Sequence, residues 1–397
     1  MSYILIFNCG SSSLKFSLMD ADSEKVELSG LAERLGGNGA EITTKCNGDK
    51  IVASLSNGSG HQEAVEYILA FLKEKGYLEQ IQAIGHRVVH GGNKFKSSAL
   101  IDQEVLDQIE ACVPLAPLHN PANLIGIKTA QVAFPHLPQV AVFDTAFHQT
   151  MPETAYLYAI PMELYRDHNV RRYGFHGTSH RFIAEKTIDT FGLDPNDHCI
   201  ISAHLGNGSS LASIKNGQSM DTTMGFTPLE GLVMGTRSGD VDPGIVKYLS
   251  TILNIDSYEI DHILNTKSGL LGVSELSNDC RTLWAAAKEG HHGAQVALEM
   301  MNYRLAKKIV SYIVPLGRLD ALVFTGGIGQ NDFMSRKKVI EHLGFLGYHL
   351  DEAANEATVG GAEGVIATSE TFGQALVLCT DEELMIVRDT LDVIACL

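Results

Sequence analysis

One carboxylate stands where α/β enzymes often carry functional groups. Asp144 directly follows the apolar run QVAVF, which predicts a buried strand. Open α/β sheets present ligand-binding groups at the carboxyl ends of their strands, so Asp144 is a candidate for catalysis or ligand binding. The alternative for an isolated aspartate is a cap on the next segment, and the residues alone favour that cap.

Basic residues and histidines gather in other glycine-flanked segments. GHRVVHGG places Arg87 and His90 on opposite faces of a short predicted strand, so only one of them can face a given cleft. APLHNP puts His119 in a proline-stiffened loop, and RRYGFHGTSH crowds arginines and histidines before a predicted helix. GTRSGDVDPG gives Arg237 a glycine-rich setting, although one such arginine alone is usually a solvated charge.

Two glycine-rich segments suggest anion binding, and several familiar motifs are excluded. NCGSSSLKF begins like a phosphate loop but lacks the second glycine of GxxxxGK, and LDALVFTGGIGQND predicts a strand that opens onto a helix N-terminus. GGIGQN fails the dinucleotide fingerprint because Asp332 stands at the third glycine position. HGTSH lacks the glutamate of a zinc protease. SSLK resembles the SxxK of penicillin-binding enzymes, but strand-like alternation after Ser13 opposes the helix which that chemistry needs.

A repeat relates the two halves of the chain. ILIFNCGSSSLKFSLMD is echoed by CIISAHLGNGSSLASIKNG, which starts at Cys199, and each copy predicts a β-hairpin with a Gly-Ser turn. The sequence therefore predicts a duplicated α/β protein with a domain boundary near residue 150. Two helix starts are also predicted: an N-cap at Ser179, with Gly192 as the stop of that helix, and a capping box of Thr380 with Glu383.

Composition narrows the function classes. A chain of 397 residues with 45% hydrophobic content can bury two cores, and a net charge of -17 argues against nucleic acid or a membrane surface as partner. The seven cysteines are scattered without a CxxC pair, which predicts neither a disulfide framework nor a zinc cluster. No export signal or membrane-spanning run is predicted, and a reducing cytoplasm is expected.

An ordered set of segments closely resembles the acetokinase family over nearly the whole chain. These segments are FNCGSSSLKF, GHRVVHGG, APLHNP, FDTAFH, RRYGFHGTSH, HLGNGSS, GFTPLEGLVMGTRSGDVDPG and FTGGIGQN. The resemblance implies a duplicated two-domain actin-like (ribonuclease H-like) ATPase fold of the α/β class, with a central nucleotide cleft. It implies a first domain of residues 1–149 plus 382–397, and a second of 150–381 for nucleotide binding and dimerisation. The Gly-Ser hairpins are then expected to hold phosphates through backbone N–H groups.

The resemblance also implies an enzyme and its reaction. The γ-phosphoryl group of ATP would pass directly and reversibly to acetate, giving acetyl phosphate and ADP, with Mg²⁺ or Mn²⁺ as cofactor and a cytoplasmic homodimer as the working form. No protein nucleophile is needed because a carboxylate substrate is already ionised at pH 7. Two alternatives stay open: a kinase for propionate or butyrate, and a non-catalytic nucleotide-gated actin-like binding protein.

Site residues follow from the same resemblance. Arg87 and Arg237 resemble the pair that binds the acyl carboxylate and the moving phosphoryl group, Asp144 the essential carboxylate, and His176 a stabiliser of phosphoryl charge. His119, His180 and His204 would line the same site. The implied substrate-methyl pocket is Val89, Leu118, Phe175 and Pro228, and the implied metal ligands are Asn8 and Glu382. The implied nucleotide contacts are Ser11, Ser13, Lys15, His204, Leu205, Gly206, Asn207, Gly208, Asp279, Cys280, Arg281, Gly327, Ile328, Gly329, Gln330 and Asn331. The chain departs from the family at Gln330, where Glu is usual, and at Asp381, where Asn is usual.

Overall fold

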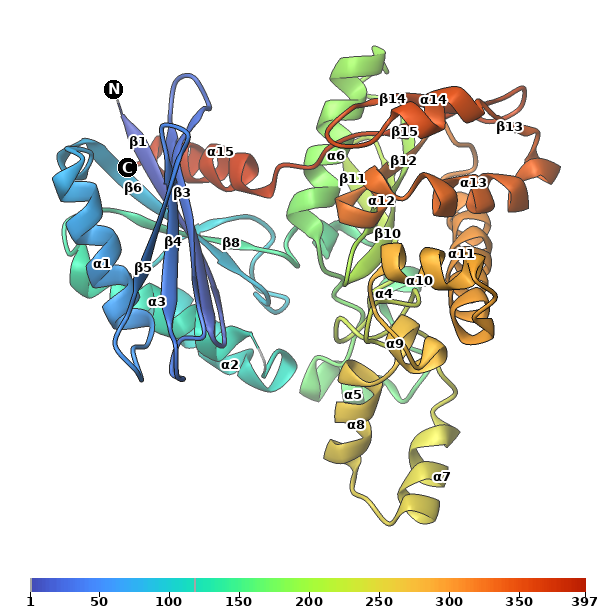
Figure 1. The fold of residues 1–397 in the computed structure, drawn as a ribbon, viewed down its shortest axis with the longest axis horizontal. Coiled ribbons are helices and arrows are strands. Elements are labelled where there is room, and N and C mark those ends of the chain that lie inside the picture. Colours follow the sequence, from blue (N-terminus) through green and yellow to red (C-terminus); the bar gives the residue numbers. More distant parts are fainter. Residues whose placement is uncertain (1, 118) are drawn as a thin grey trace. The chain divides into compact units, whose positions relative to one another are not determined.

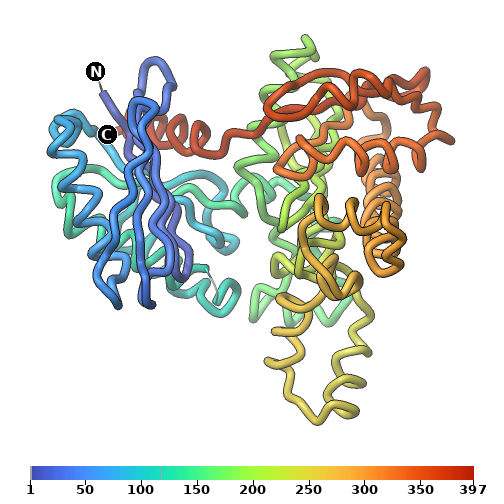
Figure 2. The backbone as a smooth tube through the Cα atoms, viewed as in Figure 1, coloured from blue at the N-terminus to red at the C-terminus, as the bar shows by residue number. Residues whose placement is uncertain are grey.

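The computed structural model describes residues 2–117 and 119–397, which form two compact units. The first unit contains the chain up to Gln149 together with Asp381–Leu397, and the second contains Thr150–Thr380. Figure 2 follows the chain out of the first unit and back to it for the final helix. The first unit is therefore built from both ends of the sequence.

An eight-stranded mixed sheet forms the centre of the first unit, with strand order β5-β4-β3-β2-β1-β6-β8-β7 (Figure 1). The strands are β1 (Tyr3–Gly10), β2 (Ser13–Asp20), β3 (Val26–Glu33), β4 (Glu41–Cys46), β5 (Asp49–Ser54), β6 (Ile81–Val88), β7 (Ala99–Leu100) and β8 (Gln139–Phe143). The helices are α1 (His61–Glu74), α2 (Gln103–Ala111), α3 (Asn120–Ala133) and α15 (Glu382–Ile394). Short 3-10 turns lie at Leu78–Gln80, Val113–Leu115 and Phe147–Thr150, the last at the unit boundary.

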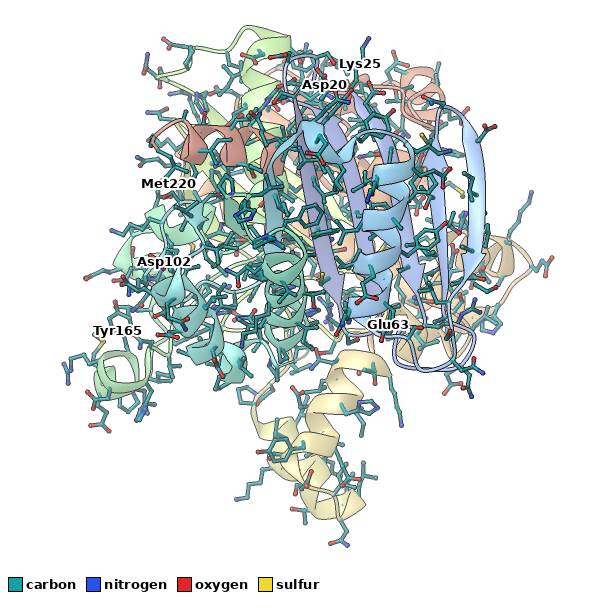
Figure 3. The ribbon with its side chains drawn as sticks, turned by 90° about the vertical axis from the view of Figure 1, so that its left-hand side faces the viewer. Asp20, Lys25, Glu63, Asp102, Tyr165 and Met220 are labelled. Atoms are coloured by element: carbon teal, nitrogen blue, oxygen red, sulfur yellow. The ribbon has the colours of Figure 1, made fainter. Side chains whose placement is uncertain are left out.

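The apolar residues of β1 alternate between two faces of this sheet. Leu5 and Phe7 belong to a core that includes Ile68 of α1, whereas Ile4 and Ile6 pack with Ile386 and other residues of α15. Alternation of side chains along a strand explains how one apolar run serves both layers. Side-chain hydrogen bonds stabilise the starts of two helices: Asp102, the N-cap of α2, accepts from Val105 N at 2.9 Å, and Glu63 in the first turn of α1 accepts from Gly60 N at 2.7 Å. Figure 3 labels Asp102 and Glu63.

The second unit is built on a seven-stranded sheet with strand order β11-β10-β9-β12-β15-β14-β13. Its strands are β9 (Cys199–Leu205), β10 (Ser209–Lys215), β11 (Gln218–Thr222), β12 (Ala321–Thr325), β13 (Tyr348–Leu350), β14 (Gly364–Ser369) and β15 (Gln374–Val377). Its helices are α4 (Glu153–Tyr156), α5 (Met162–His168), α6 (Gly177–Phe191), α7 (Gly244–Leu253), α8 (Ser257–Thr266), α9 (Gly269–Ser274), α10 (Cys280–Lys288), α11 (His292–Ile313), α12 (Gly326–Asn331), α13 (Phe333–His342) and α14 (Glu352–Ala357). A 3-10 turn lies at Gly344–Leu346.

The two units repeat one arrangement of strands. In the first, β2 and β1 form an antiparallel hairpin and β1 runs parallel to β6; in the second, β10 and β9 form the hairpin and β9 runs parallel to β12. Gly10 pairs with Ser13 at one turn and Leu205 with Ser209 at the other. Both predicted hairpins are confirmed, and Ser13 begins a strand, which excludes the SxxK helix.

Three local predictions are wrong. Helix α6 begins at Gly177 with His176 at its N-cap position, so Ser179 lies inside the helix, although Gly192 ends it as predicted with φ of 62°. Helix α15 is capped by Asp381, which accepts from Leu384 N at 2.9 Å, and not by Thr380. His90 lies beyond the end of β6, so it does not share a strand with Arg87.

Apolar residues remain exposed on α7. None of its residues is buried, and Tyr248, Ile252 and Leu253 are 64%, 53% and 51% exposed. Figure 1 shows α7 and α8 extending away from the sheet of their unit. Within residues 2–117 and 119–397, no helix combines the length and the apolar character that a membrane crossing requires.

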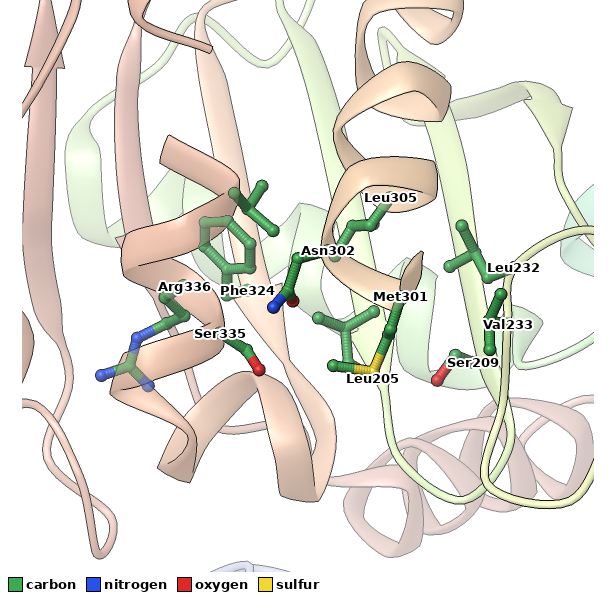
Figure 4. A pocket seen from close by; sticks show the side chains of 11 residues that line it. Leu205, Ser209, Leu232, Val233, Met301, Asn302, Leu305, Phe324, Ser335 and Arg336 are labelled. Carbon is green, nitrogen blue, oxygen red and sulfur yellow. The ribbon is translucent and has the colours of Figure 1, made fainter. Parts of the chain in front are cut away.

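A small cavity lies in the core of the second unit, next to Asn302 of α11 (Figure 4). Apolar side chains such as Leu205, Phe324 and Met301 form most of its wall. Asn302 is fully buried, and neither its amide nitrogen nor its amide oxygen has a hydrogen-bond partner among the residues that the structure describes. Unpaired buried amide groups are uncommon because losing their contact with water costs free energy.

Candidate functional site

Arg87 and Asp144 form a paired centre at the ends of two parallel strands in the first unit. β6 and β8 lie side by side, and Asp144 N donates to Val88 O at 3.0 Å, which places both side chains at one edge. Arg87 Nε donates to Asp144 Oδ1 at 3.0 Å and Nη2 donates to Oδ2 at 2.8 Å. The carboxylate is thus held by a guanidinium fork, and the capping role that the residues alone favoured is wrong.

The charge of this pair depends on its surroundings. Asp144 is buried, with 3% of its side chain exposed, whereas Arg87 keeps 24% exposed. Burial raises the pKa of the Asp144 carboxyl and Glu382 adds to the rise, whereas Arg87 lowers this pKa and His119 lowers it less. Asp144 in turn raises the pKa of Arg87, with Glu382 contributing in the same direction. Glu382 and His119 therefore lie within electrostatic reach of Asp144.

The three carboxylates at the start of α15 make different contacts. Asp381 caps the helix, and Glu383 forms an ion pair with Lys15 Nζ at 2.5 Å. Lys15 is the cross-strand neighbour of Asn8 in the β1–β2 hairpin. Asp381 and Glu383 are thus engaged, which leaves Glu382 as the carboxylate of this turn that acts on Arg87 and Asp144.

Two asparagines that the sequence did not single out connect α3 to this edge. Asn123 donates to Cys9 O at 2.9 Å and accepts from Val89 N at 3.1 Å. Asn120 accepts from His90 N at 3.2 Å and donates to His90 O at 3.0 Å. They hold the end of β1 and the segment after Arg87 in place. Ser11 and Ser13 lie at the turn of the same hairpin, and Leu118 lies outside the described residues.

A cluster of histidines stands at the start of α6 in the second unit. Ser202 and His204 of β9 point toward α6 because they alternate with the core residues Ile201, Ala203 and Leu205. His176 has a left-handed backbone with φ of 57°, and its ring stacks on His204 with centroids 4.2 Å apart. The Ser179 hydroxyl bonds to His204 Nδ1 and to Thr380 Oγ1, both at 2.8 Å. The hydroxyl predicted as a cap therefore supports the histidine cluster instead.

Arg237 and His176 meet at the turn of the second hairpin. A Cβ placed on Gly208 would lie 3.3 Å from Arg237 Nη1 and 3.6 Å from His176 Nε2. Arg237 Nη1 also donates to Pro228 O at 3.2 Å, which connects it to the segment that carries one predicted wall of the methyl pocket. Burial lowers the pKa of Arg237. Glycine at position 208 thus leaves open the space where a cation and an imidazole converge.

A pocket of about 610 Å³ lies beside this turn, a size typical of small-molecule sites. It brings together members of three predicted nucleotide segments: Gly206, Asn207, Asp279, Cys280, Arg281, Gly327, Ile328 and Asn331. The pocket lining does not include the predicted contacts His204, Leu205, Gly208, Gly329 and Gln330. Lining residues that the sequence did not indicate are Asn278, Trp284, Asp332, Phe333 and Met334.

Hydrogen bonds fix the walls of the pocket. Asp279 caps α10 by accepting from Arg281 N at 2.8 Å, and its carboxylate also pairs with the Arg281 guanidinium at 2.6 Å. Trp284 Nε1 donates to Asp332 Oδ2 at 3.0 Å. Burial raises the pKa of Cys280 to about 12, so its thiol is protonated and unsuited to nucleophilic attack. The position of Trp284 one helical turn after Cys280 was the available signal for it.

Arg336 of α13 supports the glycine-rich segment from behind. Its Nη1 donates to Gly329 O at 2.9 Å and to Gln330 O at 2.8 Å. Gln330, which departs from the family pattern, is thus held through its backbone carbonyl.

The two units have matching hairpins, and in the second unit an arginine and a histidine meet at the glycine turn beside a pocket large enough for a nucleotide. Together with the similar proteins described below, these features identify a phosphotransferase with a two-domain actin-like ATPase fold. The model of the acetokinase family matches residues 3–388. This chain belongs to the acetokinase family. The predicted family, fold class and assignment to the phosphotransferases are confirmed.

Individual relatives are similar over nearly their full length. The acetate kinase of Chromobacterium violaceum is 56% identical over 389 residues, which cover 98% of each chain. Acetate kinase 2 of Neisseria meningitidis serogroup B is 54% identical over 387 residues, covering 98% of this chain and 97% of the relative. Among solved structures, a Francisella tularensis propionate kinase has a TM-score of 0.94 and the Porphyromonas gingivalis acetate kinase 0.93. Both are 45% identical and cover 99% of this chain and all of theirs.

Proposed function

We propose that this chain transfers the γ-phosphoryl group of ATP reversibly to acetate, giving acetyl phosphate and ADP. The observation that carries the proposal is the Gly208 turn, where Arg237 and His176 converge next to a pocket of nucleotide size. Relatives named acetate kinase with more than half of their residues identical support the choice of acetate.

The proposed mechanism is direct in-line transfer. An acetate oxygen, ionised at pH 7, attacks the γ-phosphorus while the bond to the ADP oxygen breaks, so the protein supplies positioning and charge stabilisation. Arg237 and His176 donate hydrogen bonds to the phosphoryl oxygens, and Arg87 holds the carboxylate of acetate through Nη1, the nitrogen outside its pair with Asp144. Asp144 fixes the orientation of that guanidinium group.

Mg²⁺ fits the oxygen donors of the first unit, and Mn²⁺ accepts the same ligand type. Asn8 and Glu382 would hold the ion directly or through water, and the charge of Asp144 lies within electrostatic reach of Glu382. Among the described residues, no group of three or more His, Cys, Asp or Glu side chains is arranged as a metal cage. Mg²⁺ usually keeps several waters and binds substrate phosphates. When bound, the ion would neutralise phosphate charge.

The second unit is proposed to bind the nucleotide, with the base in the pocket beside Trp284 and the phosphates at residues 206–208. Trp284 is the single tryptophan of the chain, so its fluorescence reports this pocket alone. Titration with ADP should change the emission with saturation. Emission that stays constant up to millimolar ADP would place the nucleotide elsewhere.

A propionate kinase is the second candidate, because one propionate kinase structure is as similar to this chain as the acetate kinase structure is. A difference of one methylene in an apolar pocket is worth only about 1–3 kcal/mol. Val89, Phe175 and Pro228 are the described members of the proposed methyl pocket. We expect kcat/KM to be highest for acetate among acetate, propionate and butyrate, and a higher value for a longer acid would reassign the substrate.

Two further properties belong to the proposal. The exposed apolar surface of α7 supports a homodimer formed through the second unit, which sedimentation would detect as twice the mass of the chain. All seven cysteines are within the described residues and are free thiols, which supports work in a reducing cytoplasm.

The decisive experiment is an acyl-hydroxamate assay with ATP, Mg²⁺ and acetate. Arg237→Ala should lower kcat by about 10² or more, because it removes a charged donor to the transition state. Asp144→Asn should be similarly damaging, since it loosens the hold on Arg87. Arg166→Ala on the exposed end of α5 is the matched control in the second unit. Absence of acetyl hydroxamate with the unmodified protein would reject the proposed function.

A further inference from the structure

A chain of hydrogen bonds runs from β9 to the ring of His176. The Ser202 hydroxyl lies 3.0 Å from His180 Nδ1, and the Ser210 hydroxyl lies 2.8 Å from His180 Nε2 and 2.9 Å from His176 Nδ1. Ser202, Ser210 and His180 are fully buried. The hydroxyl protons of Ser202 and Ser210 must therefore find their acceptors inside the protein.

The number of donors and acceptors determines which atom donates in each hydrogen bond of this network. Among the residues that the structure describes, Ser202 Oγ has one hydrogen-bond partner, the Nδ1 atom of His180. A buried hydroxyl whose single partner is a ring nitrogen satisfies its proton only by donating it. His180 Nδ1 is then an acceptor, so the ring proton of a neutral His180 resides on Nε2.

The same reasoning determines which nitrogen of His176 accepts a hydrogen bond. His180 Nε2–H donates to Ser210 Oγ, and the Ser210 proton has one remaining acceptor, the Nδ1 atom of His176. The reverse direction would leave the Ser202 proton without an acceptor, and so would a doubly protonated His180. A neutral His176 in this network therefore carries its proton on Nε2.

We propose that Ser210 and His180 are positioning residues that hold His176 as the Nε2–H tautomer, ready to donate a hydrogen bond to a phosphoryl oxygen. His176 Nε2 faces the space at Gly208 that Arg237 also enters, at 3.6 Å from a Cβ built there. The opposite tautomer would present a lone pair to an anion and repel it. The catalytic part of this inference rests on the proposed function, whereas the tautomer itself does not.

NMR of protein labelled with ¹⁵N-histidine tests the tautomer without any substrate. The signals of His176 are assigned by their loss in His176→Gln. We expect Nδ1 of His176 to show the shift of an unprotonated acceptor and Nε2 that of a protonated nitrogen. A protonated Nδ1 in the unmodified protein would overturn the inference, whether or not the protein transfers phosphoryl groups.

Kinetics test the positioning role. Ser210→Ala should shift His176 toward a mixture of tautomers and lower kcat about tenfold, less than the ~10² to 10³ for loss of a whole donor, with little change in KM for ATP. The control is Ser213→Ala, which removes an equally buried hydroxyl from β10 that donates to Tyr312 O at 2.7 Å. Ser210→Thr keeps the hydroxyl and should restore kcat.

Equal losses of kcat in Ser210→Ala and Ser213→Ala would assign Ser210 a merely structural role and reject the positioning role. An inactive unmodified protein whose His176 is the Nε2–H tautomer would reject the proposed function and support the hydrogen-bond direction. If Ser210→Ala does not fold, the spectrum of the unmodified protein still decides the tautomer.

Discussion

Replacing Arg336 by methionine should destabilise the protein and weaken nucleotide binding. Arg336 is 1% exposed, and all five of its N–H donors are used by neutral acceptors. Nε donates to Asn355 Oδ1 at 2.8 Å, and Nη2 donates to Asn355 O at 2.7 Å and Thr358 O at 2.8 Å. Together with the bonds to Gly329 and Gln330, these contacts connect α12 to α14.

The magnitude follows from these acceptors. A buried acceptor left unsatisfied costs about 1 kcal/mol or more; four of these bonds are buried and the bond to Gln330 O is partly buried, so the loss is about 4–5 kcal/mol. Removing a guanidinium that is buried without a bonded carboxylate recovers part of this free energy, because burial lowers the pKa of Arg336 to about 10 against the opposing effect of Asp332. We expect a net loss of roughly 3 kcal/mol in the free energy of unfolding.

Urea unfolding and ADP titration, both followed by Trp284 fluorescence, measure the two effects. The control Arg318→Met removes an arginine whose side chain is 45% exposed and should change stability little. Arg336→Lys keeps the charge but loses the fork, so it should fall between Arg336→Met and the unmodified protein. Unchanged stability and ADP affinity in Arg336→Met would show that the carbonyls of α12 and α14 do not depend on this side chain.

Three further outcomes are expected. Asn302→Leu should raise the free energy of unfolding by about 1 kcal/mol, because it removes two unpaired amide groups beside a small cavity; a loss in urea unfolding would mean that the amide is satisfied, for example by a bound water. Burial lowers the pKa of His86 to about 4, so the unfolded chain binds the extra proton first and stability falls as the pH drops from about 6.5 to 4. His86→Gln should remove up to about 3 kcal/mol of that loss, and an unchanged pH dependence of the unfolding midpoint would contradict the shift. Gly208→Ala should lower kcat about tenfold at nearly constant stability, because the new methyl group enters the space next to Arg237; full activity in the hydroxamate assay would show that this space is not used.

Sequence reasoning succeeded where the signal was local or ordered along the chain. Alternating apolar residues around a Gly-Ser turn predicted both hairpins, because strand periodicity is a property of neighbouring residues. The ordered segments led to the family, and three of them meet in the pocket beside Trp284. The roles of individual site residues remain predictions.

Sequence reasoning failed where a side chain bonds to a residue that is distant in the sequence. Ser179 and Thr380 both match capping patterns, but their hydroxyls bond to each other and Ser179 also bonds to His204. Asp144 reads as a cap until β6 brings Arg87 beside it, a contact across 57 positions of sequence. Arg336 gave no local signal, because its acceptors belong to carbonyls on other helices.

The left-handed backbone of His176 means that selection for stability and selection for activity would favour different residues at this position. A residue with a Cβ pays about 1–2 kcal/mol to adopt this conformation, whereas glycine adopts it freely. A directed-evolution screen that rewards heat resistance alone would therefore favour glycine at this position and discard the imidazole. Libraries built on this scaffold should score turnover alongside thermal tolerance.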